Sequence, residues 1–223
     1  MSAVSPIITA QGARNYLSER LHVSRETMGR IEQFVAALRE ANNQQNLVSG
    51  STLDDDSMWC RHIADSAQLL GLAGGGGGTW ADLGSGAGLP GLVIALIAPH
   101  WRVTLVESRK LRCDFLQGVI TALALQDRVT LYHGRVESLA ASHFDVISAR
   151  AFAPLDKLLA MSGHLASEST LWLLPKGKNA QMELSTLPHT WQKAFKVEPS
   201  ITHGESRILI GRGAMLARKA QRS

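Results

Sequence analysis

Four glycines fall among the eight residues from Gly84 to Gly91, directly after a short apolar run that ends at Leu83. Each glycine costs backbone entropy on folding, so the cluster needs a structural reason. We expect a strand over residues 79–83, a tight turn, and a helix over residues 90–98. A strand, a glycine turn and a helix N-terminus bring backbone N–H groups close to a ligand. The stretch therefore predicts a ligand-binding unit of an open α/β sheet.

The identity of that ligand depends on Asp82. The segment from Gly86 to Gly91 matches the dinucleotide pattern G-x-G-x-x-G, but this match alone is weak. Asp82 precedes Gly84 by two residues, and we expect its carboxylate at the mouth of the turn, where it would repel a pyrophosphate and attract a cation. S-adenosylmethionine carries an ammonium and a sulfonium and no phosphate. Asp82 therefore favours this methyl donor over a dinucleotide.

A second carboxylate, Glu107, ends the next predicted strand, over residues 102–107. A carboxylate in this position accepts hydrogen bonds from ribose hydroxyls. Because NAD and S-adenosylmethionine share that ribose, Glu107 is compatible with both. An NAD(P)-dependent oxidoreductase stays open as an alternative, and so does a tight turn without a ligand.

The pattern along the chain predicts a doubly wound, mostly parallel sheet. Ser24 is a candidate N-cap, and a helical apolar periodicity from Ile31 to Leu38 follows it. A second helix is expected from Asp54 to about residue 70, and five glycines at 74–78 then form a connector. We divide the chain into an N-terminal helical segment, 1–73, and an α/β domain, 74–223. Strands are expected at 79–83, 102–107, 129–133, 144–149, 171–174, 194–197 and 207–210, with helices after the first, second and fourth of them, the last two at about 111–125 and 155–165.

Composition limits the class of protein. The chain has 223 residues, of which 45% are hydrophobic and 19% charged, as in globular proteins. The longest apolar run, 92–98, is too short to span a bilayer, so no membrane association is expected. Cys60 and Cys113 are isolated, which favours reduced thiols and a cytoplasmic location. The eight histidines lack metal-ligand spacing, and we expect no metal.

The positive charge is concentrated in the last third of the chain. Residues 150–223 contain 11 basic and 5 acidic side chains, whereas residues 1–73 contain 6 and 8. This asymmetry indicates a polyanionic partner, with a solvated basic surface as the alternative. Within this part, Lys176, Lys178 and Arg207 are the candidates for contacts to the phosphates of such a partner, with a solvated turn as the alternative for Lys176 and Lys178.

The segment after the fourth expected strand limits the chemistry. Methylation of an exocyclic amine usually relies on an Asn/Asp-Pro-Pro-aromatic turn there, but this chain has Ser-Ala-Arg-Ala-Phe-Ala-Pro at 148–154. Methylation of a pyrimidine carbon needs a cysteine nucleophile, and both cysteines lie elsewhere. Guanine N7 has a free lone pair at neutral pH and loses no proton. The absence of an evident base is therefore consistent with transfer to guanine N7.

Several segments in the same order resemble the family of ribosomal RNA small subunit methyltransferase G, also called glucose-inhibited division protein B. The resemblance implies a Rossmann-like class I methyltransferase that transfers a methyl group from S-adenosylmethionine to N7 of a guanine in 16S ribosomal RNA. One departure is Glu107, where the family usually has aspartate. The matching segments are 46–47, 61–66, 82–91, 107–108, 135–137, 148–153 and 176–177.

The resemblance also implies roles for individual residues. Arg150 is the candidate catalytic residue and would reach the donor or the target base, with an ion pair to a core carboxylate as the alternative. Phe152 is a candidate stacking partner of the base, with a place in the core as the alternative. His62 is expected to be structural, because N7 transfer needs no base. The partner would be 16S ribosomal RNA or the small ribosomal subunit, bound by a monomer; a non-catalytic RNA-binding assembly factor is the further alternative. The implied donor contacts are Asp82, Gly84, Ser85, Gly86, Gly88, Leu89, Glu107, Val136, Glu137 and Arg150.

Overall fold

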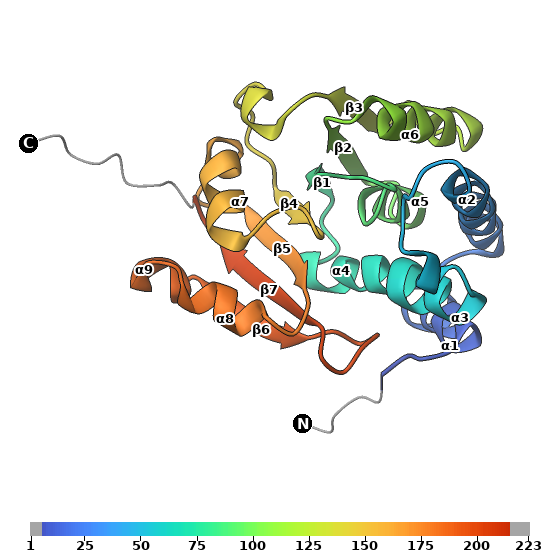
Figure 1. Ribbon diagram of the computed structural model, residues 1–223, viewed down its shortest axis with the longest axis horizontal. Helices are drawn as coiled ribbons and strands as arrows, with labels where there is room; N and C mark the ends of the chain where they lie inside the picture. The colour runs from blue at the N-terminus through green and yellow to red at the C-terminus, as the bar shows by residue number, and fades with distance from the viewer. Residues whose placement is uncertain (1–5, 215–223) are drawn as a thin grey trace, which may run out of the picture.

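The computed structural model describes residues 6–214 and contains a seven-stranded sheet between two layers of helices (Figure 1). The strand order is β3-β2-β1-β4-β5-β7-β6. The predicted doubly wound, mostly parallel sheet is confirmed, but the antiparallel pairing of β7 with both β5 and β6 was not predicted. The strands are β1 (Gly78–Leu83), β2 (Trp101–Glu107), β3 (Val129–His133), β4 (Val146–Ala149), β5 (Leu171–Lys176), β6 (Phe195–Pro199) and β7 (Arg207–Arg212).

Side-chain caps begin two of the N-terminal helices, at or next to the residues where the sequence predicts a helix start. The hydroxyl of Ser24 accepts the N–H of Thr27 at 3.1 Å, and the carboxylate of Asp54 accepts that of Ser57 at 2.8 Å. The helices are α1 (Ala10–Asn15), α2 (Arg25–Asn42), α3 (Asp55–Ser57), α4 (Asp65–Ala73), α5 (Gly91–Ile97), α6 (Lys110–Ala122), α7 (Leu155–Ser162), α8 (Ala180–Ser185) and α9 (His189–Gln192). Shorter π and 3₁₀ segments are η1 (Tyr16–Arg20), η2 (Gly50–Thr52), η3 (Met58–Ala64), η4 (Val136–Ser138) and η5 (Gly163–Leu165).

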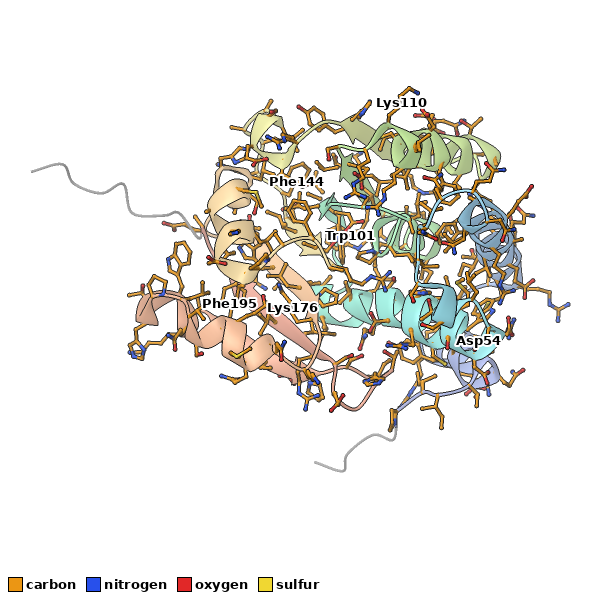
Figure 2. The ribbon with its side chains drawn as sticks, viewed as in Figure 1. Asp54, Trp101, Lys110, Phe144, Lys176 and Phe195 are labelled. Carbon is orange, nitrogen blue, oxygen red and sulfur yellow. The ribbon has the colours of Figure 1, made fainter. Side chains whose placement is uncertain are left out.

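The N-terminal helices share a hydrophobic core with one face of the sheet. Phe34 of α2 and Trp59 of η3 belong to the same buried cluster as Leu92 of α5 and Trp101 of β2. Trp101 packs edge-on against Trp80, with ring centroids 5.2 Å apart (Figure 2). This core is continuous across the boundary at residue 73, and the division into two parts stays a prediction. A second cluster, built from α7, α8 and the other face, includes Trp172 and Leu158.

The strand order predicts a ligand site at the edge of the sheet where the parallel strands end. The order of the parallel strands reverses between β1 and β4, and ligands of open α/β sheets bind beyond the carboxyl ends of the strands at such a switch point. Asp82, Glu107 and Arg150 lie at or next to the carboxyl ends of β1, β2 and β4. Among residues 6–214, no helix is long and apolar enough to cross a membrane.

Candidate functional site

Two cavities lie beyond the carboxyl ends of the central strands. The glycine-turn cavity, of about 450 Å³, is bounded by Gly84, Glu107, Val136 and Glu137 together with neighbouring residues. The Arg150 cavity, of about 610 Å³, is bounded by Asp65, Arg150, Lys176 and Arg207 among others. Residues 151–153 belong to the walls of both cavities. Two ligand-sized spaces therefore share the segment that follows β4.

Hydrogen bonds to β2 fix the glycine turn. The backbone N–H groups of Gly84 and Ser85 both donate to the carbonyl of Val106, at 2.9 and 3.0 Å. The Ser85 hydroxyl donates to the carbonyl of Asp82 and accepts the N–H of Val106. Ser85 is buried, so the structure uses its side chain to shape the turn, and a donor contact by Ser85 stays a prediction.

Asp82 lies beneath the turn and not at its mouth, which corrects the expected placement. Its carboxylate accepts the N–H of Gly91 at 3.1 Å and the hydroxyl of Ser148 at 3.0 Å. Only 1% of Asp82 is exposed, and burial raises the pKa of its carboxyl to about 6. It borders neither cavity, because both oxygens are used to join the turn, α5 and β4. Any attraction of a cationic donor by Asp82 would act through the turn and stays a prediction.

The four glycines of the turn serve different purposes. A Cβ on Gly84 would lie 2.2 Å from Cδ2 of Phe152, and one on Gly88 would lie 2.3 Å from Cδ1 of Leu92. At Gly86 the nearest heavy atom would be 3.7 Å away, so the protein itself leaves room there. Gly86, Gly88 and the buried Leu89 do not border the glycine-turn cavity, and their donor contacts stay predictions.

Glu107 is the best-placed group for a ribose. Its Oε1 accepts the N–H groups of Ser108 and Arg109, both at 2.8 Å, and its Oε2 accepts the N–H of Gly86 at 3.0 Å. Arg112 is 3.8 Å from Oε2. Since a carboxylate oxygen accepts two hydrogen bonds, Oε2 retains one position for a ligand hydroxyl.

Part of the wall of the glycine-turn cavity comes from the segment after β3 and from α7. Val136 and Glu137, in η4, border the cavity; Val136 is buried and Glu137 is exposed. The side chain of Met161 also borders this space, a contact that the sequence did not predict. A ribose acceptor and two apolar residues, Val136 and Met161, in the walls of one cavity are compatible with the nucleoside part of S-adenosylmethionine.

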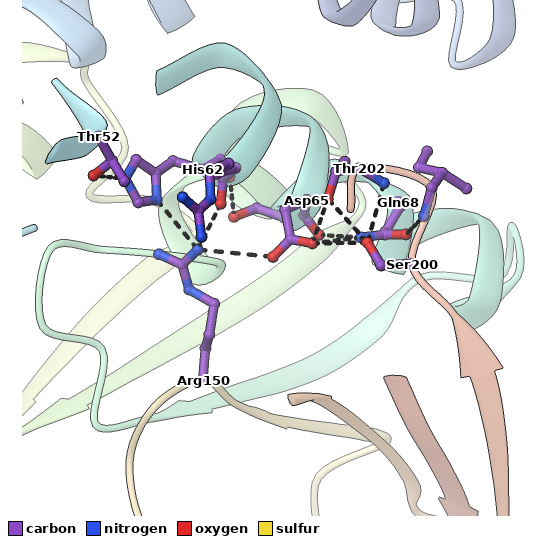
Figure 3. Close-up of polar contacts among 10 residues, drawn as sticks. Thr52, His62, Asp65, Gln68, Arg150, Ser200 and Thr202 are labelled. Carbon is purple, nitrogen blue, oxygen red and sulfur yellow. Dashed lines mark hydrogen bonds and ion pairs between the residues drawn. The ribbon is translucent and has the colours of Figure 1, made fainter. Parts of the chain in front are cut away.

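Arg150 extends from the end of β4 to η3 and the start of α4 (Figure 3). Its Nη1 donates to the carbonyl of Arg61 at 3.0 Å and to Nδ1 of His62 at 3.3 Å, and it lies 3.8 Å from Oδ2 of Asp65. Among the described residues, none accepts a hydrogen bond from Nε or Nη2 of Arg150. The guanidinium is thus held by one end and can donate to a substrate with the other.

The hydrogen bonds of His62 determine its protonation state. A guanidinium only donates, so Nδ1 of His62 is the acceptor and Nε2 carries the proton, which it donates to the Thr52 hydroxyl at 2.8 Å. That hydroxyl donates in turn to the carbonyl of Ser49. Burial, and secondarily the charge of Arg150, lower the pKa of His62 to about 3. His62 is therefore a neutral support for Arg150.

This neutral histidine predicts a specific loss of stability in acid. The pKa of His62 is lowered from 6.5 to about 3 on folding, so below pH 6.5 the unfolded chain binds a proton that the folded protein does not. Stability is therefore present above pH 6.5 and is lost as the pH falls toward 3. Between pH 7 and pH 5, the free energy of unfolding should fall by about 2 kcal/mol more in the wild type than in His62→Gln. Denaturant unfolding at each pH measures this difference. The exposed His189, changed to Gln, is the matched control, and equal pH slopes for wild type and His62→Gln would contradict the assignment.

The side chains of the turn after β4 border different cavities. Ala151 has φ of +50°, a left-handed conformation that residues other than glycine seldom adopt. Arg150, before it, borders only the Arg150 cavity, whereas Phe152, after it, borders both cavities and covers Gly84. The strained turn therefore places a cation and an aromatic ring at the junction between the two spaces.

Comparison with known proteins assigns the chain to a family. The family model described as GidB, rRNA small subunit methyltransferase G, matches residues 27–210. A relative named ribosomal RNA small subunit methyltransferase G from Sphingopyxis alaskensis is 47% identical over 98% of this chain and 93% of its own length. One of the same name from Rhizorhabdus wittichii is 48% identical over 91% of this chain and 92% of its own length. The chain belongs to this family. The predicted family and enzyme class are thereby confirmed, and S-adenosylmethionine is the methyl donor.

Solved structures show the same fold at low sequence identity. A mutant of MtNAS in complex with S-adenosylmethionine aligns with a TM-score of 0.58 and 17% identity, over 92% of this chain and 84% of that one. The glycopeptide N-methyltransferase MtfA aligns with a TM-score of 0.53 and 13% identity, over 68% of this chain and 90% of that one. These likenesses confirm the predicted Rossmann-like class I methyltransferase fold.

The three candidate RNA-binding residues of this methyltransferase G chain are placed differently from one another. The side chain of Lys176, labelled in Figure 2, is 11% exposed. Its ammonium donates to Glu183 at 2.8 Å and to the carbonyl of Ala153 at 3.1 Å. Arg207 donates to the carbonyls of Gly204 and Ser206 and borders the Arg150 cavity. Lys178 is exposed in the turn after β5. RNA contact by all three stays a prediction. Within residues 6–214, the side chain of Lys178 makes no hydrogen bond or ion pair that a charge reversal would break.

Two site residues of this methyltransferase G chain were missed in the sequence. Asp65 pairs with Arg150, whose Nη1 lies 3.8 Å from its Oδ2. Glu183 borders the Arg150 cavity and orients Lys176. The segment 61–66 was the only signal for Asp65, and periodicity gave no signal for either, because both contacts join residues far apart in sequence. Among residues 6–214, no group of three or more metal-ligating side chains is present.

Proposed function

We propose that this protein transfers a methyl group from S-adenosylmethionine to N7 of a guanine in 16S ribosomal RNA. The observation that carries the proposal is the junction of two cavities at residues 151–153, in a chain that belongs to the methyltransferase G family. The glycine-turn cavity has the ribose acceptor and would hold the donor. The Arg150 cavity would then hold the target base.

The groups at the junction support a nucleophile that needs no base. Nδ1 of His62 is occupied by Arg150, and the pKa of His62, about 3, keeps the ring neutral at working pH. Guanine N7 carries its own lone pair, so no proton has to be removed. S-adenosylmethionine supplies an activated methyl group when bound. The chain contributes orientation and exclusion of water, which are large effects when the reacting atoms are held in line.

Arg150 is suited to hold a guanine by its Hoogsteen edge. Guanine presents N7 and O6 side by side as acceptors, and arginine is a frequent partner of this edge. N7 must remain free for methylation, so the unpartnered N–H groups of Arg150 would donate to O6. Phe152, at the junction, would provide an apolar surface against the base.

The remaining parts of the proposal concern the substrate and its surroundings. The enzyme would act as a monomer in the cytoplasm, on 16S ribosomal RNA alone or within the small subunit. Arg207 borders the Arg150 cavity, and Lys178 lies between Gly177 and Asn179, which also border it, so both would contact phosphates of an RNA bound there. Phosphate contacts position the RNA without reading its sequence.

The experiment that tests the proposal uses methyl-labelled S-adenosylmethionine and ribosomal RNA from a strain that lacks this protein. The purified protein should label the 16S RNA and not the 23S RNA. In calorimetry, S-adenosylhomocysteine should bind to the protein and NADH should not. Binding of RNA without label would favour a non-catalytic assembly factor. Binding of NADH would favour an oxidoreductase.

A further inference from the structure

A carboxylate, that of Asp65, lies next to the guanidinium of Arg150 in the wall of the Arg150 cavity. Asp65, the first residue of α4, borders this cavity, and its side chain is 14% exposed. Its Oδ2 lies 3.8 Å from Nη1 of Arg150, too far for a direct hydrogen bond. A donor group and an acceptor group therefore stand side by side on one wall.

The carboxylate of Asp65 is held in one orientation. Its Oδ1 accepts from Nε2 of Gln68 at 2.7 Å, from the Thr202 hydroxyl at 3.0 Å and from the Ser200 hydroxyl at 3.2 Å (Figure 3). Oε1 of Gln68 accepts the N–H of Ile201 at 3.0 Å, which fixes the end of the Gln68 amide that faces Asp65. Within residues 6–214, no hydrogen bond reaches Oδ2. This oxygen is an oriented acceptor available to a ligand.

This pair of groups matches one edge of guanine. O6 accepts and the adjacent N1–H donates, so a guanidinium and a carboxylate side by side complement both atoms. Adenine presents the opposite pattern, with a donor at position 6 and an acceptor at N1. N7 lies beside O6 on the side away from N1. A guanine held in this way would direct N7 away from Asp65.

We propose that Oδ2 of Asp65 accepts the N1–H of the target guanine while Arg150 donates to O6, which makes Asp65 a specificity-determining residue. This inference rests on the proposed function. Methylation of N7 leaves a positive charge on the base, next to the positive charge of Arg150. The negative charge of Asp65 lies beside these two positive charges and reduces the repulsion between them. The same contact therefore assists both the recognition of guanine and the methyl transfer.

The variant Asp65→Asn tests the contact with little change in shape. Because Gln68 presents a fixed donor to the δ1 position, the carbonyl oxygen of the new amide should take that position and its NH₂ group should face the cavity. A donor would then oppose the N1–H of guanine. We expect methylation of guanine-containing RNA to fall roughly 10- to 100-fold. The affinity for S-adenosylhomocysteine should not change, because Asp65 does not border the glycine-turn cavity.

Base analogues separate recognition from a structural role. In 16S ribosomal RNA ligated with 2-aminopurine at the methylated position, the base lacks O6 and presents an acceptor at N1. The wild type should prefer guanine over this base by roughly 100-fold. In Asp65→Asn the preference should shrink at least tenfold, because the NH₂ group can donate to N1. Inosine keeps O6 and N1–H, so the wild type should methylate an inosine-containing RNA at a rate within a few-fold of that for guanine.

The outcomes distinguish this inference from the proposed function. If the wild type methylates no guanine-containing 16S RNA, the proposed function fails. If the wild type methylates guanine-containing 16S RNA but methylates the 2-aminopurine RNA at the same rate, the inference is overturned and the function stands. The same holds if Asp65→Asn keeps the wild-type preference for guanine over 2-aminopurine. Asp65→Ala, which removes the acceptor without adding a donor, should also narrow the preference and serves if the Asn variant unfolds. Asp156→Asn, on the exposed first turn of α7, is the matched control and should behave as wild type.

Discussion

Replacing Arg150 by alanine is expected to lower the rate of methyl transfer by roughly 100-fold or more. The change removes the donor proposed for O6 of the base and leaves the carboxylate of Asp65 without its cation at 3.8 Å. It also leaves Nδ1 of His62 without its hydrogen bond, so the contact between β4 and η3 is lost together with the proposed contact to the base. Arg150→Lys should recover little, because an ammonium lacks the planar fork that reaches the Arg61 carbonyl and the substrate together.

The measurement is a single-turnover rate at saturating RNA and donor, paired with calorimetry of S-adenosylhomocysteine. Donor affinity should stay within a few-fold of wild type, since Arg150 borders only the Arg150 cavity. Arg212→Ala is the control; this arginine donates to the carbonyl of Ser169 at the far end of β7. A rate near wild type for Arg150→Ala would remove Arg150 from the mechanism, and a loss of donor affinity alone would assign it to the donor.

Gly84→Ala is expected to lower the free energy of unfolding by about 2–4 kcal/mol and to weaken donor binding. Gly84 has φ of +68°, and its Cβ would lie 2.2 Å from the ring of Phe152. The ring must move, and it forms part of both cavities. Left-handed strain accounts for about 1–2 kcal/mol and overpacking for the rest.

Gly86→Ala is the matched comparison for this variant. Gly86 also has a positive φ, of +54°, but the nearest heavy atom to its Cβ would be 3.7 Å away. We therefore expect only the strain, about 1–2 kcal/mol. Thermal and denaturant unfolding of the two variants measure the difference. If both lose the same stability, the close packing of Phe152 on Gly84 is not the reason for glycine at position 84.

The fold was largely predictable because its signals are local. The apolar run before Gly84, the N-caps Ser24 and Asp54, and the alternation of short apolar runs with helical periods each depend on neighbouring residues. The antiparallel insertion of β7 between β5 and β6 was not predictable. A short apolar strand such as β7 carries no mark of its direction, and only its pairing in the sheet defines it.

The site was predictable in its outline and not in its contacts. Glu107 was a candidate because a carboxylate at the end of a parallel strand faces the ligand edge, and Arg150 because of the family resemblance; the structure places both in cavity walls, and their roles stay predictions. Asp82 also follows this pattern, yet its carboxylate turns inward to Gly91 and Ser148, since the turn itself needs an acceptor beneath it. Asp65 could not be found in this way, because its contact with Arg150 spans 85 positions and depends on how η3 and α4 pack against the sheet.

The N7 atom of a guanine is the central claim, and chain cleavage tests it most directly. N7-methylguanine becomes a break in the chain after reduction and treatment with aniline. The 16S ribosomal RNA of a strain that lacks this protein should show no such break. Incubation with the protein and S-adenosylmethionine should create one break, at one guanine, and omission of either should prevent it. Transfer of a methyl group to this RNA without a new break, or a break already present in the strain that lacks the protein, would contradict the account.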